Sequence, residues 1–428
     1  MAHSSTANSV PVSRRSVLKA LGTVGGALAL GPMAAAQSQQ AVPPVSGPEV
    51  NPRWNAMGPY VSEPQKVPLI LLTDRPIQLE TPRHYFQEAF TPNSAFYVRW
   101  HLSEIPNAVD LKDWRLRIEG NVEKAASYSL ADLMHKFPAQ TFAAVNQCSG
   151  NSRSYARPRV AGGQWGHGAM GNARWTGVRL QDLLRAAAPK RGSVQVQFQG
   201  LESGVGPEGL GSRMFQKSLD LNNPVVGECI VAYAMNGEPL PMLNGFPVRL
   251  VVPGYFGTYW MKSLTWIRIL DKVDENFWMK TGYRIPDTPG GNTTPEDVKA
   301  GSVKTIPIHR MPVRSFIISP GGDTAIPAGM AVHVRGIAFS GHGAIRKVDV
   351  SWDGLKTWQP ARLGEDLGQY SFRTWEFTWT PATPGRYTFA VRATDSTGSA
   401  QLDEATWNAG GYLWSRIERQ QYLVGTAG

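Results

Sequence analysis

The chain has 428 residues and a formal net charge of +10, and 42% of its residues are hydrophobic. This length allows two or three domains with their own cores, and the 44 glycines and 32 prolines disfavour a long helical bundle or coiled coil. Two cysteines, Cys148 and Cys229, exclude a disulfide framework, a four-cysteine metal site and a CxxCH haem-attachment motif. The basic residues are scattered, which favours a small anion or an acidic partner over nucleic acid.

Residues 1–36 are typical of a twin-arginine signal peptide. Arg14 and Arg15 precede a weakly apolar stretch rich in glycine and alanine, which ends in the small residues of 34–36. Glycines and Pro32 interrupt the stretch, so it falls short of the roughly 20 apolar residues that a spanning helix needs. We expect removal of this segment, export of the folded protein to the periplasm, and no membrane span in the mature chain.

The remaining chain divides by composition and periodicity into four parts. Residues 37–65 are polar and rich in proline, and they predict an extended N-terminal arm. Residues 66–290 mix short strand patterns with a few helical ones, such as 180–188, and predict an α+β catalytic domain. Residues 291–310 are predicted to be a linker. Alternating apolar residues in 348–352, 375–379 and 387–393 predict that 311–428 form a β-sandwich of the immunoglobulin type.

The two cysteines lie in different surroundings. Cys148 follows an apolar strand and lies among small polar turn formers, with Arg153 five residues later, so the thiol is presented from a loop. A thiolate in such a place can act as a soft metal ligand or as a nucleophile. Cys229 lies in the apolar run 225–235, which is typical of a buried, inert cysteine.

Three basic residues occupy strand positions where their surroundings leave two interpretations open. Arg99 and His101 alternate with apolar residues and so share one face of a predicted strand, about 7 Å apart. That face is either a solvated surface or an anion-binding pair. Arg373 is in phase with the apolar face of 375–379, where a charge needs either a structural ion pair or a bound anion.

Several longer motifs resemble one known family over nearly the whole mature sequence. They are the CxGNxR loop (148–153), Trp165 with GAMGNARWTGV (168–178), AYAMNGEPLP (232–241), GFPVRLVVPGYFGTYWMK (245–262), SWDGLKTW (351–358) and RATDSTG (392–398). Together they resemble the sulfite oxidase family of molybdopterin enzymes, in particular its bacterial periplasmic sulfite dehydrogenases. The resemblance implies a mixed molybdopterin domain followed by an immunoglobulin-like dimerisation domain.

The resemblance also implies a molybdenum–molybdopterin cofactor and residues that hold it. Cys148 falls where the family's cysteine ligates molybdenum, and Tyr233 matches the tyrosine near the reacting oxygen. Arg249 and Lys262 match positions that contact the pterin and its phosphate. Asn244 departs from the histidine that many animal members have before GFPVR, which puts one pterin contact in doubt and favours the bacterial branch.

The substrate implied by the resemblance is sulfite, which the family oxidises to sulfate. Arg99, Arg153 and Arg373 match basic residues around the substrate oxyanion, His101 matches a residue of the bacterial RxH strand, and Trp165 lines that pocket. Together these residues would offset the charge of the anion and orient it. Arg373 would place the active site where the two domains meet.

The resemblance leaves the electron route and three alternatives open. Without a haem motif or a haem domain on this chain, electrons would pass singly to a c-type cytochrome, either as a subunit or as an acceptor. We expect a homodimer or a heteromer with that cytochrome. The alternatives are a sulfite dehydrogenase component of a thiosulfate-oxidising complex, a molybdopterin sulfoxide reductase, and an exported sandwich protein that binds a partner without catalysis.

Overall fold

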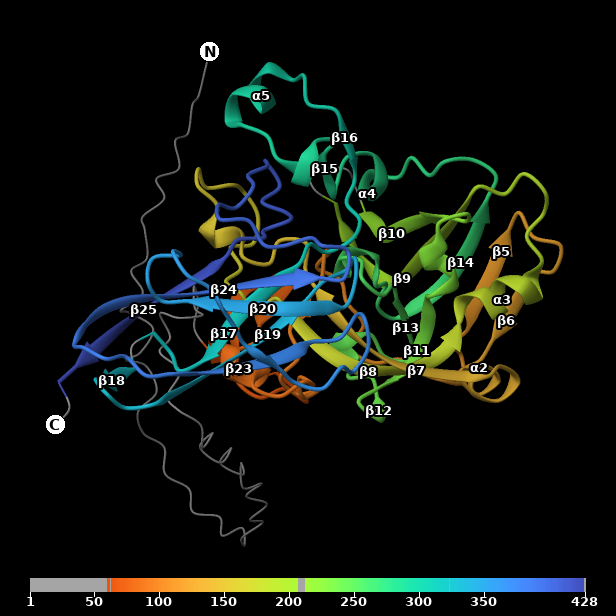
Figure 1. The fold of residues 1–428 in the computed structure, drawn as a ribbon. Coiled ribbons are helices and arrows are strands. Elements are labelled where there is room, and N and C mark those ends of the chain that lie inside the picture. Colours follow the sequence, from red (N-terminus) through yellow and green to blue (C-terminus); the bar gives the residue numbers. More distant parts are fainter. Residues whose placement is uncertain (1–59, 62, 207–211, 323, 427–428) are drawn as a thin grey trace, which may run out of the picture. The chain divides into compact units, whose positions relative to one another are not determined.

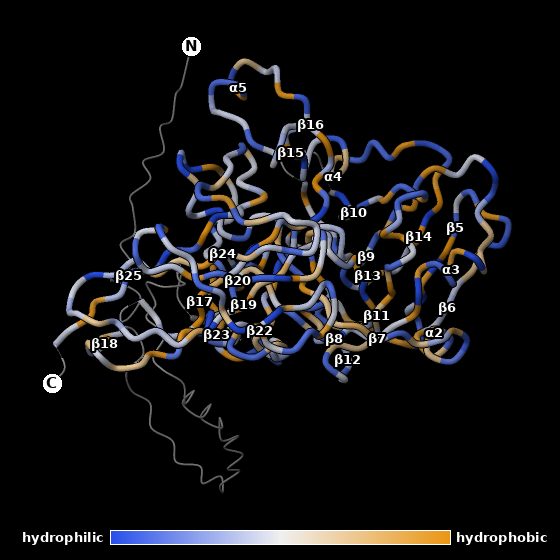
Figure 2. The backbone as a smooth tube through the Cα atoms, viewed as in Figure 1, coloured by the Kyte–Doolittle hydropathy of each residue, from blue (hydrophilic) through white to orange (hydrophobic). Residues whose placement is uncertain are grey.

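The computed structural model describes residues 60–61, 63–206, 212–322 and 324–426 (Figure 1). The predicted signal peptide and nearly all of the predicted N-terminal arm lie outside these residues. None of the helices in the described part of the chain has the length and apolarity needed to cross a membrane. Figure 2 shows that hydrophobic residues concentrate on the central strands, whereas the loops around α2 and α5 are mostly hydrophilic.

An antiparallel meander opens the described chain and carries the first predicted site residues. Its strands are β1 (Tyr60–Val61), β2 (Leu69–Asp74), β3 (Ile77–Glu80) and β4 (Val98–Arg99). Leu69, Leu79, Val98 and Trp100 form a small core of their own beneath this sheet. Because Val98 and Trp100 are fixed in that core, Arg99 between them faces the opposite way.

Two further sheets build the rest of the catalytic domain. The second sheet has the order β10-β9-β14-β5-β6, and only β14 and β5 run parallel. Its strands are β5 (Leu116–Gly120), β6 (Ala126–Tyr128), β9 (Gln195–Val205), β10 (Ser212–Asp220) and β14 (Leu264–Leu270).

The third sheet has the order β12-β11-β8-β7, with β13 also paired to β11. Its strands are β7 (Ala139–Gln147), β8 (Met170–Arg179), β11 (Ile230–Met235), β12 (Glu238–Pro239) and β13 (Arg249–Val251).

Helices are few and short, as the glycine and proline content indicates. The α-helices are α2 (Leu130–Lys136), α3 (Leu180–Ala187), α4 (Phe277–Lys280) and α5 (Pro295–Ala300). The 3-10 turns are η1 (Arg83–Phe86), η2 (Arg153–Tyr155), η4 (Pro224–Gly227), η5 (Met242–Asn244), η6 (Gly257–Tyr259) and η7 (Pro289–Gly291). The structure confirms the helix predicted over 180–188, whose leucines are buried. The apolar run 225–235 is η4 followed by β11 rather than one continuous strand.

The segment predicted as a linker contains regular structure. Thr294 caps α5, and its side chain and that of Asp297 form a reciprocal capping box. Strand β16 (Thr305–Pro307) pairs with β15 (Arg284–Pro286), so the chain returns to the catalytic domain before it enters the sandwich. Composition alone does not reveal this pairing, because it depends on a partner strand 20 residues away.

The C-terminal part is a sandwich of two sheets around a core that includes Trp375, Trp379 and Phe389. One sheet has the order β17-β19-β23-β22, and its strands are β17 (Arg314–Ser319), β19 (Val332–Phe339), β22 (Arg362–Leu363) and β23 (Arg373–Trp379). The other has the order β18-β25-β24-β20-β21, and its strands are β18 (Ala325–Pro327), β20 (Ile345–Ser351), β21 (Gln359–Pro360), β24 (Gly385–Asp395) and β25 (Glu418–Gly425). The three strand patterns predicted in the sequence fall on β20, β23 and β24.

The sandwich contacts the loop that carries Cys148. Arg314 of β17 donates from Nη1 to Gln147 Oε1 at 3.1 Å and from Nη2 to Ser152 Oγ at 2.8 Å. The backbone N–H of Val145 donates to the carbonyl of Tyr370 at 2.8 Å. Both ends of the Cys148 loop are therefore held by contacts that only the complete chain can make.

Candidate active site

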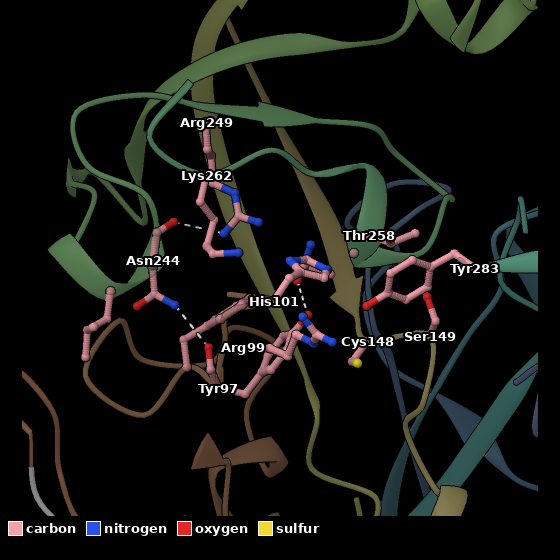
Figure 3. Close-up of a pocket in the computed structure, with 14 residues that line it drawn as sticks. Tyr97, Arg99, His101, Cys148, Ser149, Asn244, Arg249, Thr258, Lys262 and Tyr283 are labelled. Atoms are coloured by element: carbon pink, nitrogen blue, oxygen red, sulfur yellow. Dashed lines mark hydrogen bonds between the residues drawn. The ribbon is translucent and has the colours of Figure 1, made fainter. Parts of the chain in front are cut away.

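A pocket beside Cys148 gathers side chains from several distant segments (Figure 3). Five of the predicted site residues line it: Arg99, His101, Cys148, Arg249 and Lys262. In Figure 3, Cys148, Ser149 and Tyr283 lie on one side of the pocket, and Asn244, Arg249 and Lys262 lie on the other. The pocket is thus built between the metal-ligand candidate and the residues predicted to hold a pterin.

Cys148 lies at the first position after β7, and its backbone is fixed on both sides. Its N–H donates to the carbonyl of Ala169 at 2.9 Å, and its carbonyl accepts from the N–H of Asn151 at 3.0 Å. The left-handed Ser152, with φ 74°, turns the chain into η2. Cys229 is fully buried, its thiol contacts the carbonyl of Val225 at 3.1 Å, and burial raises the pKa of that thiol. Cys229 is thus the buried core cysteine that the sequence predicts. Cys148 lies in the predicted loop and lines the pocket, but it is also buried, with 8% of its surface exposed, and it belongs to the main hydrophobic core.

Arg99 brings a positive charge into the pocket. Burial alone would lower the pKa of Arg99, but the surrounding Tyr283, Cys148 and Glu202 raise it above its usual value. Its Nη1 is buried and has no hydrogen-bond partner among the described residues, and its guanidinium lies 5.9 Å from the centre of the Tyr283 ring. A charged donor left unpaired at a pocket wall is suited to bind an anion.

His101 also faces the pocket. Its ring stacks on Phe215 at 3.5 Å, and its Nδ1 lies 3.3 Å from a carboxylate oxygen of Glu202. Burial, together with the nearby Arg99, holds the pKa of His101 well below its ordinary value, and Glu202 opposes this shift. The solvated-surface interpretation of Arg99 and His101 is wrong, because both line the pocket. That His101 helps to offset the substrate's charge stays a prediction.

Glu202 on β9 contacts both His101 and Lys262 at the pocket, and it is not among the predicted site residues. Its carboxylate accepts the backbone N–H groups of His101 and Leu102, the latter at 2.8 Å, and lies 3.7 Å from the Nζ of Lys262. Burial alone would raise the pKa of Glu202, but His101 and Lys262 outweigh it and lower this pKa to about 2. Burial lowers the pKa of Lys262 to about 8. A lone glutamate in a strand has no sequence signal for such a role.

We expect Glu202→Gln to destabilise the protein by about 3 to 5 kcal/mol, because it leaves Lys262 buried without its counter-charge. The folded-state pKa lies below that of the unfolded chain, so this stability is present above about pH 4.5 and is lost as pH falls toward 2. Denaturant unfolding at pH 7 and at pH 3 measures both effects. A difference between the variant and the parent that stays constant over this range would contradict the assignment.

Arg249 and Asn244 form the opposite side of the pocket. Arg249 donates to the carbonyls of Asn244 at 3.0 Å and of Trp260 at 3.2 Å, and its guanidinium lies 5.2 Å and 5.6 Å from the centres of the Trp175 and Trp260 rings. Burial lowers the pKa of Arg249 to about 10. Asn244 donates to the carbonyl of Tyr97 at 3.1 Å and accepts from Lys66. The asparagine that departs from the family pattern therefore still lines the pocket.

Arg153 and Trp165 are close to the pocket but do not line it. Arg153 donates to the carbonyls of Gly410 at 2.9 Å and Gly163 at 3.1 Å, and its guanidinium lies 5.2 Å from the centre of the Tyr412 ring. Trp165 is buried with its ring edge-on to Tyr97 at 6.4 Å. Both predicted residues thus support the wall of the pocket from outside in this structure.

Two predicted residues lie elsewhere. Tyr233 is on β11 and does not line the pocket, so its predicted place at the site is wrong. Arg373 does not line it either: its Nη1 pairs with Asp366 at 2.7 Å, which is the structural ion pair that the sequence left as an alternative. The alternation of residues in β23 predicted which face of the strand carries Arg373, but it did not predict that Asp366 pairs with this side chain.

Two tyrosines line the pocket: Tyr97, whose hydroxyl donates to Asn146 Oδ1, and Tyr283, which lies between α4 and β15. The ring of Tyr283 stacks at 5.9 Å on that of Tyr412, so the C-terminal segment reaches the site through Tyr412 rather than Arg373. Burial raises the pKa of Tyr283 far above its ordinary value, so the phenol keeps its proton and can donate. Tyr283 lies in an irregular segment, where no periodic pattern indicates a role for it.

The residues of the pocket fit the cofactor that the resemblance implies. Five lining residues have a buried polar atom without a partner among the described residues: Arg99 Nη1, Asn146 Nδ2, Ser149 Oγ, Arg249 Nε and Thr258 Oγ1. Each such donor costs about 1 to 3 kcal/mol unless it is satisfied, so their clustering indicates a group rich in acceptors, such as a pterin with its phosphate. Among the described residues no three His, Cys, Asp or Glu side chains could hold a metal, so Cys148 would be the one soft ligand that the pocket offers to a metal carried by such a cofactor.

Comparison with known families gives two matches along the chain. Residues 102–278 match the model of the oxidoreductase molybdopterin binding domain, and residues 305–421 match that of the Mo-co oxidoreductase dimerisation domain. The first match spans three of the five predicted residues that line the pocket, and Arg99 and His101 lie just before it. The second match covers the sandwich.

Curated relatives and a solved structure agree with these matches. The chain is 32% identical to mitochondrial sulfite oxidase of Rattus norvegicus over 87% of this chain and 69% of that protein. It is 33% identical to sulfite oxidase of Gallus gallus over 85% of this chain and 80% of that protein. The fold is similar to that of the sulfane dehydrogenase SoxCD from Paracoccus pantotrophus, with a TM-score of 0.70, 24% identity, and coverage of 86% of this chain and 91% of that one. The chain therefore belongs to the sulfite oxidase family of molybdopterin oxidoreductases.

Proposed function

We propose that this protein oxidises sulfite to sulfate in the periplasm, at a molybdenum–molybdopterin centre ligated by Cys148, and passes the electrons singly to a c-type cytochrome. One observation carries the proposal. The Cys148 loop, the unpaired Nη1 of Arg99 and the ring of Tyr283 meet in a single pocket. This arrangement combines a soft ligand with a site for a small oxyanion.

The chain's own residues would bind and orient the substrate. When bound, the cofactor accepts two electrons and supplies oxygen-atom transfer, so that sulfite and water give sulfate, two protons and two electrons. Arg99 would hold the anion, and its effect is strong because its Nη1 is buried at the pocket. Tyr283 would donate a hydrogen bond from its phenol, which stays protonated at neutral pH because burial raises its pKa. Glu202 would keep His101 and Lys262 in place.

The electron acceptor in this proposal is a separate protein. The sequence has no CxxCH motif and only two cysteines, so it offers neither a c-type haem attachment nor an iron–sulfur cluster of its own. The net positive charge favours an acidic docking face on the acceptor. The match to a dimerisation domain supports a homodimer through the sandwich. The twin-arginine pattern supports the periplasm, where c-type cytochromes are available as partners.

Sulfite-dependent reduction of ferricytochrome c by the molybdenum-loaded protein tests this function. We expect turnover with sulfite that falls as ionic strength rises, because transient docking of a basic protein onto an acidic partner is screened by salt. Parallel assays with sulfane sulfur compounds and with reduction of sulfoxides address the two other redox alternatives. A protein that holds molybdenum but gives no sulfite-dependent reduction of any acceptor would contradict the proposal.

A further inference from the structure

A fully buried lysine lies directly behind Tyr283 of the pocket. Lys217 is on β10 and has no exposed surface. Its Nζ donates to the carbonyl of Trp278 at 2.5 Å, and it lies 4.9 Å and 5.6 Å from the ring centres of Tyr259 and Tyr283. Among the described residues no carboxylate comes within 4.0 Å of it. Lys217 therefore holds a buried charge that no ion pair balances.

A buried ammonium without a counter-ion is costly, and a methionine would fill the same space without that cost. Burial and, to a smaller extent, the nearby Arg284 lower the pKa of Lys217 to about 7, and Asp274 opposes this shift. What stabilises the charge is the Trp278 carbonyl and the negative faces of the two tyrosine rings. All three of these partners belong to the neighbourhood of Tyr283.

The turn that carries Tyr283 is held at two neighbouring carbonyls. Lys217 binds the carbonyl of Trp278, and Arg284 donates from Nη1 to the carbonyl of Met279 at 2.8 Å. The N–H of Gly282 donates to the carbonyl of Phe277 at 2.7 Å, which closes the turn. Tyr283 itself is left-handed, with φ 55°, a conformation that persists only where its surroundings enforce it. Lys217 is one of the groups that enforce it.

Two basic side chains lie within 6 Å of the centre of the Tyr283 ring. The Arg99 guanidinium is 5.9 Å from its centre and the Lys217 ammonium is 5.6 Å from it. Arg99 lines the pocket, whereas Lys217 does not. A positive charge beside a phenol makes its O–H a stronger hydrogen-bond donor, and an anion in the pocket would feel that effect. Lys217 can therefore influence chemistry in the pocket through Tyr283.

We propose that Lys217 is a positioning residue for Tyr283: it anchors the turn through the Trp278 carbonyl, and its charge strengthens the phenol as a donor to the substrate anion. The proposal rests on the function proposed above, because it assigns Tyr283 to the oxyanion of that substrate. It separates two contributions of Lys217, which are the hydrogen bond to Trp278 and the positive charge.

Three substitutions separate these contributions in the molybdenum-loaded enzyme. We expect Lys217→Met to lower kcat for sulfite about ten-fold while KM changes less than two-fold. Lys217→Gln keeps a donor for the Trp278 carbonyl but loses the charge, and it should show a similar fall in kcat. Lys217→Arg keeps the charge and should recover kcat to within three-fold of the parent. Lys280→Met is the matched control, because Lys280 lies on the same turn but pairs with Glu275 in solvent.

A double-mutant cycle with Tyr283→Phe shows whether Lys217 acts through the phenol. If it does, Lys217→Met should change kcat less than two-fold once the hydroxyl is absent, because no donor is left to strengthen. Additive effects of the two substitutions would overturn the proposal, as would a full fall in kcat in Lys217→Arg. Should Lys217→Met fail to fold, the same cycle is run with Lys217→Gln, to which the same two outcomes apply.

A measurement on the metal-free protein distinguishes failure of this inference from failure of the proposed function. Hydrogen–deuterium exchange of the peptide that covers 277–284 should be at least five-fold faster in Lys217→Met than in the parent, and unchanged in Lys280→Met. This result supports the anchoring role even if the loaded parent enzyme proves inactive with sulfite. Unchanged exchange in Lys217→Met would overturn the anchoring role whatever the substrate is.

Discussion

Replacing Cys148 with serine is expected to abolish sulfite oxidation and to lower the molybdenum content of the purified protein, while the fold survives. A serine hydroxyl is a hard, protonated and weak ligand, whereas the thiolate is soft and matches molybdenum beside a dithiolene. The backbone of residue 148 is held by Ala169 and Asn151 through main-chain bonds, which serine keeps. Steady-state turnover and elemental analysis of the metal measure the two effects.

Cys229→Ser is the matched control for this prediction. Cys229 is fully buried on the way into β11, far from the pocket lining, so a hydroxyl there costs stability through desolvation, about 1 to 3 kcal/mol. Its kcat should stay near that of the parent while its Tm falls. Full activity in Cys148→Ser, or loss of activity without loss of stability in Cys229→Ser, would show that the site has been assigned to the wrong cysteine.

Arg99→Met is expected to lower kcat/KM for sulfite by about 10-fold to 150-fold. The change removes a charge-assisted hydrogen bond to an anion, which contributes roughly 1.5 to 3 kcal/mol, and each 1.4 kcal/mol corresponds to a factor of ten. Methionine keeps an unbranched apolar stem but removes the guanidinium, which lies 5.9 Å from the centre of the Tyr283 ring. Steady-state kinetics over a range of sulfite concentrations give the ratio directly.

Arg373→Met controls for the loss of a positive charge in general. Because Arg373 pairs with Asp366 at 2.7 Å and does not line the pocket, we expect kcat/KM to change less than two-fold. The two variants thus compare the arginine that the structure places at the site with one that the strand pattern suggested. Equal effects in both would mean that the protein's overall charge, rather than a defined oxyanion site, governs sulfite binding.

Local periodicity and residue chemistry are enough to predict three strands of the sandwich, one helix and the loop that carries Cys148. Alternating apolar residues predicted strands that the structure has as β20, β23 and β24, and the leucines of 180–188 predicted α3. Turn formers around Cys148 predicted a presented thiol. Such signals survive because a buried face repeats every two or 3.6 residues, whatever packs against it. The family motifs added the cofactor and most of its pocket.

Which side chains line the pocket, and which neighbours they contact, depends on the tertiary structure. Arg373 shares the strand face of Trp375 and Trp379, and Asp366 balances its charge in an ion pair. The alternation of residues along a strand cannot show that Asp366 is its partner. Three residues of this region lie in separate segments of the chain: Glu202, Lys217 and Tyr283. No local sequence pattern indicates their roles, because each role depends on contacts with residues about 60 to 180 positions away in the chain. An active-site pocket is assembled by long-range packing, which fixes the distances and the burial that set its charges, and a one-dimensional pattern contains neither.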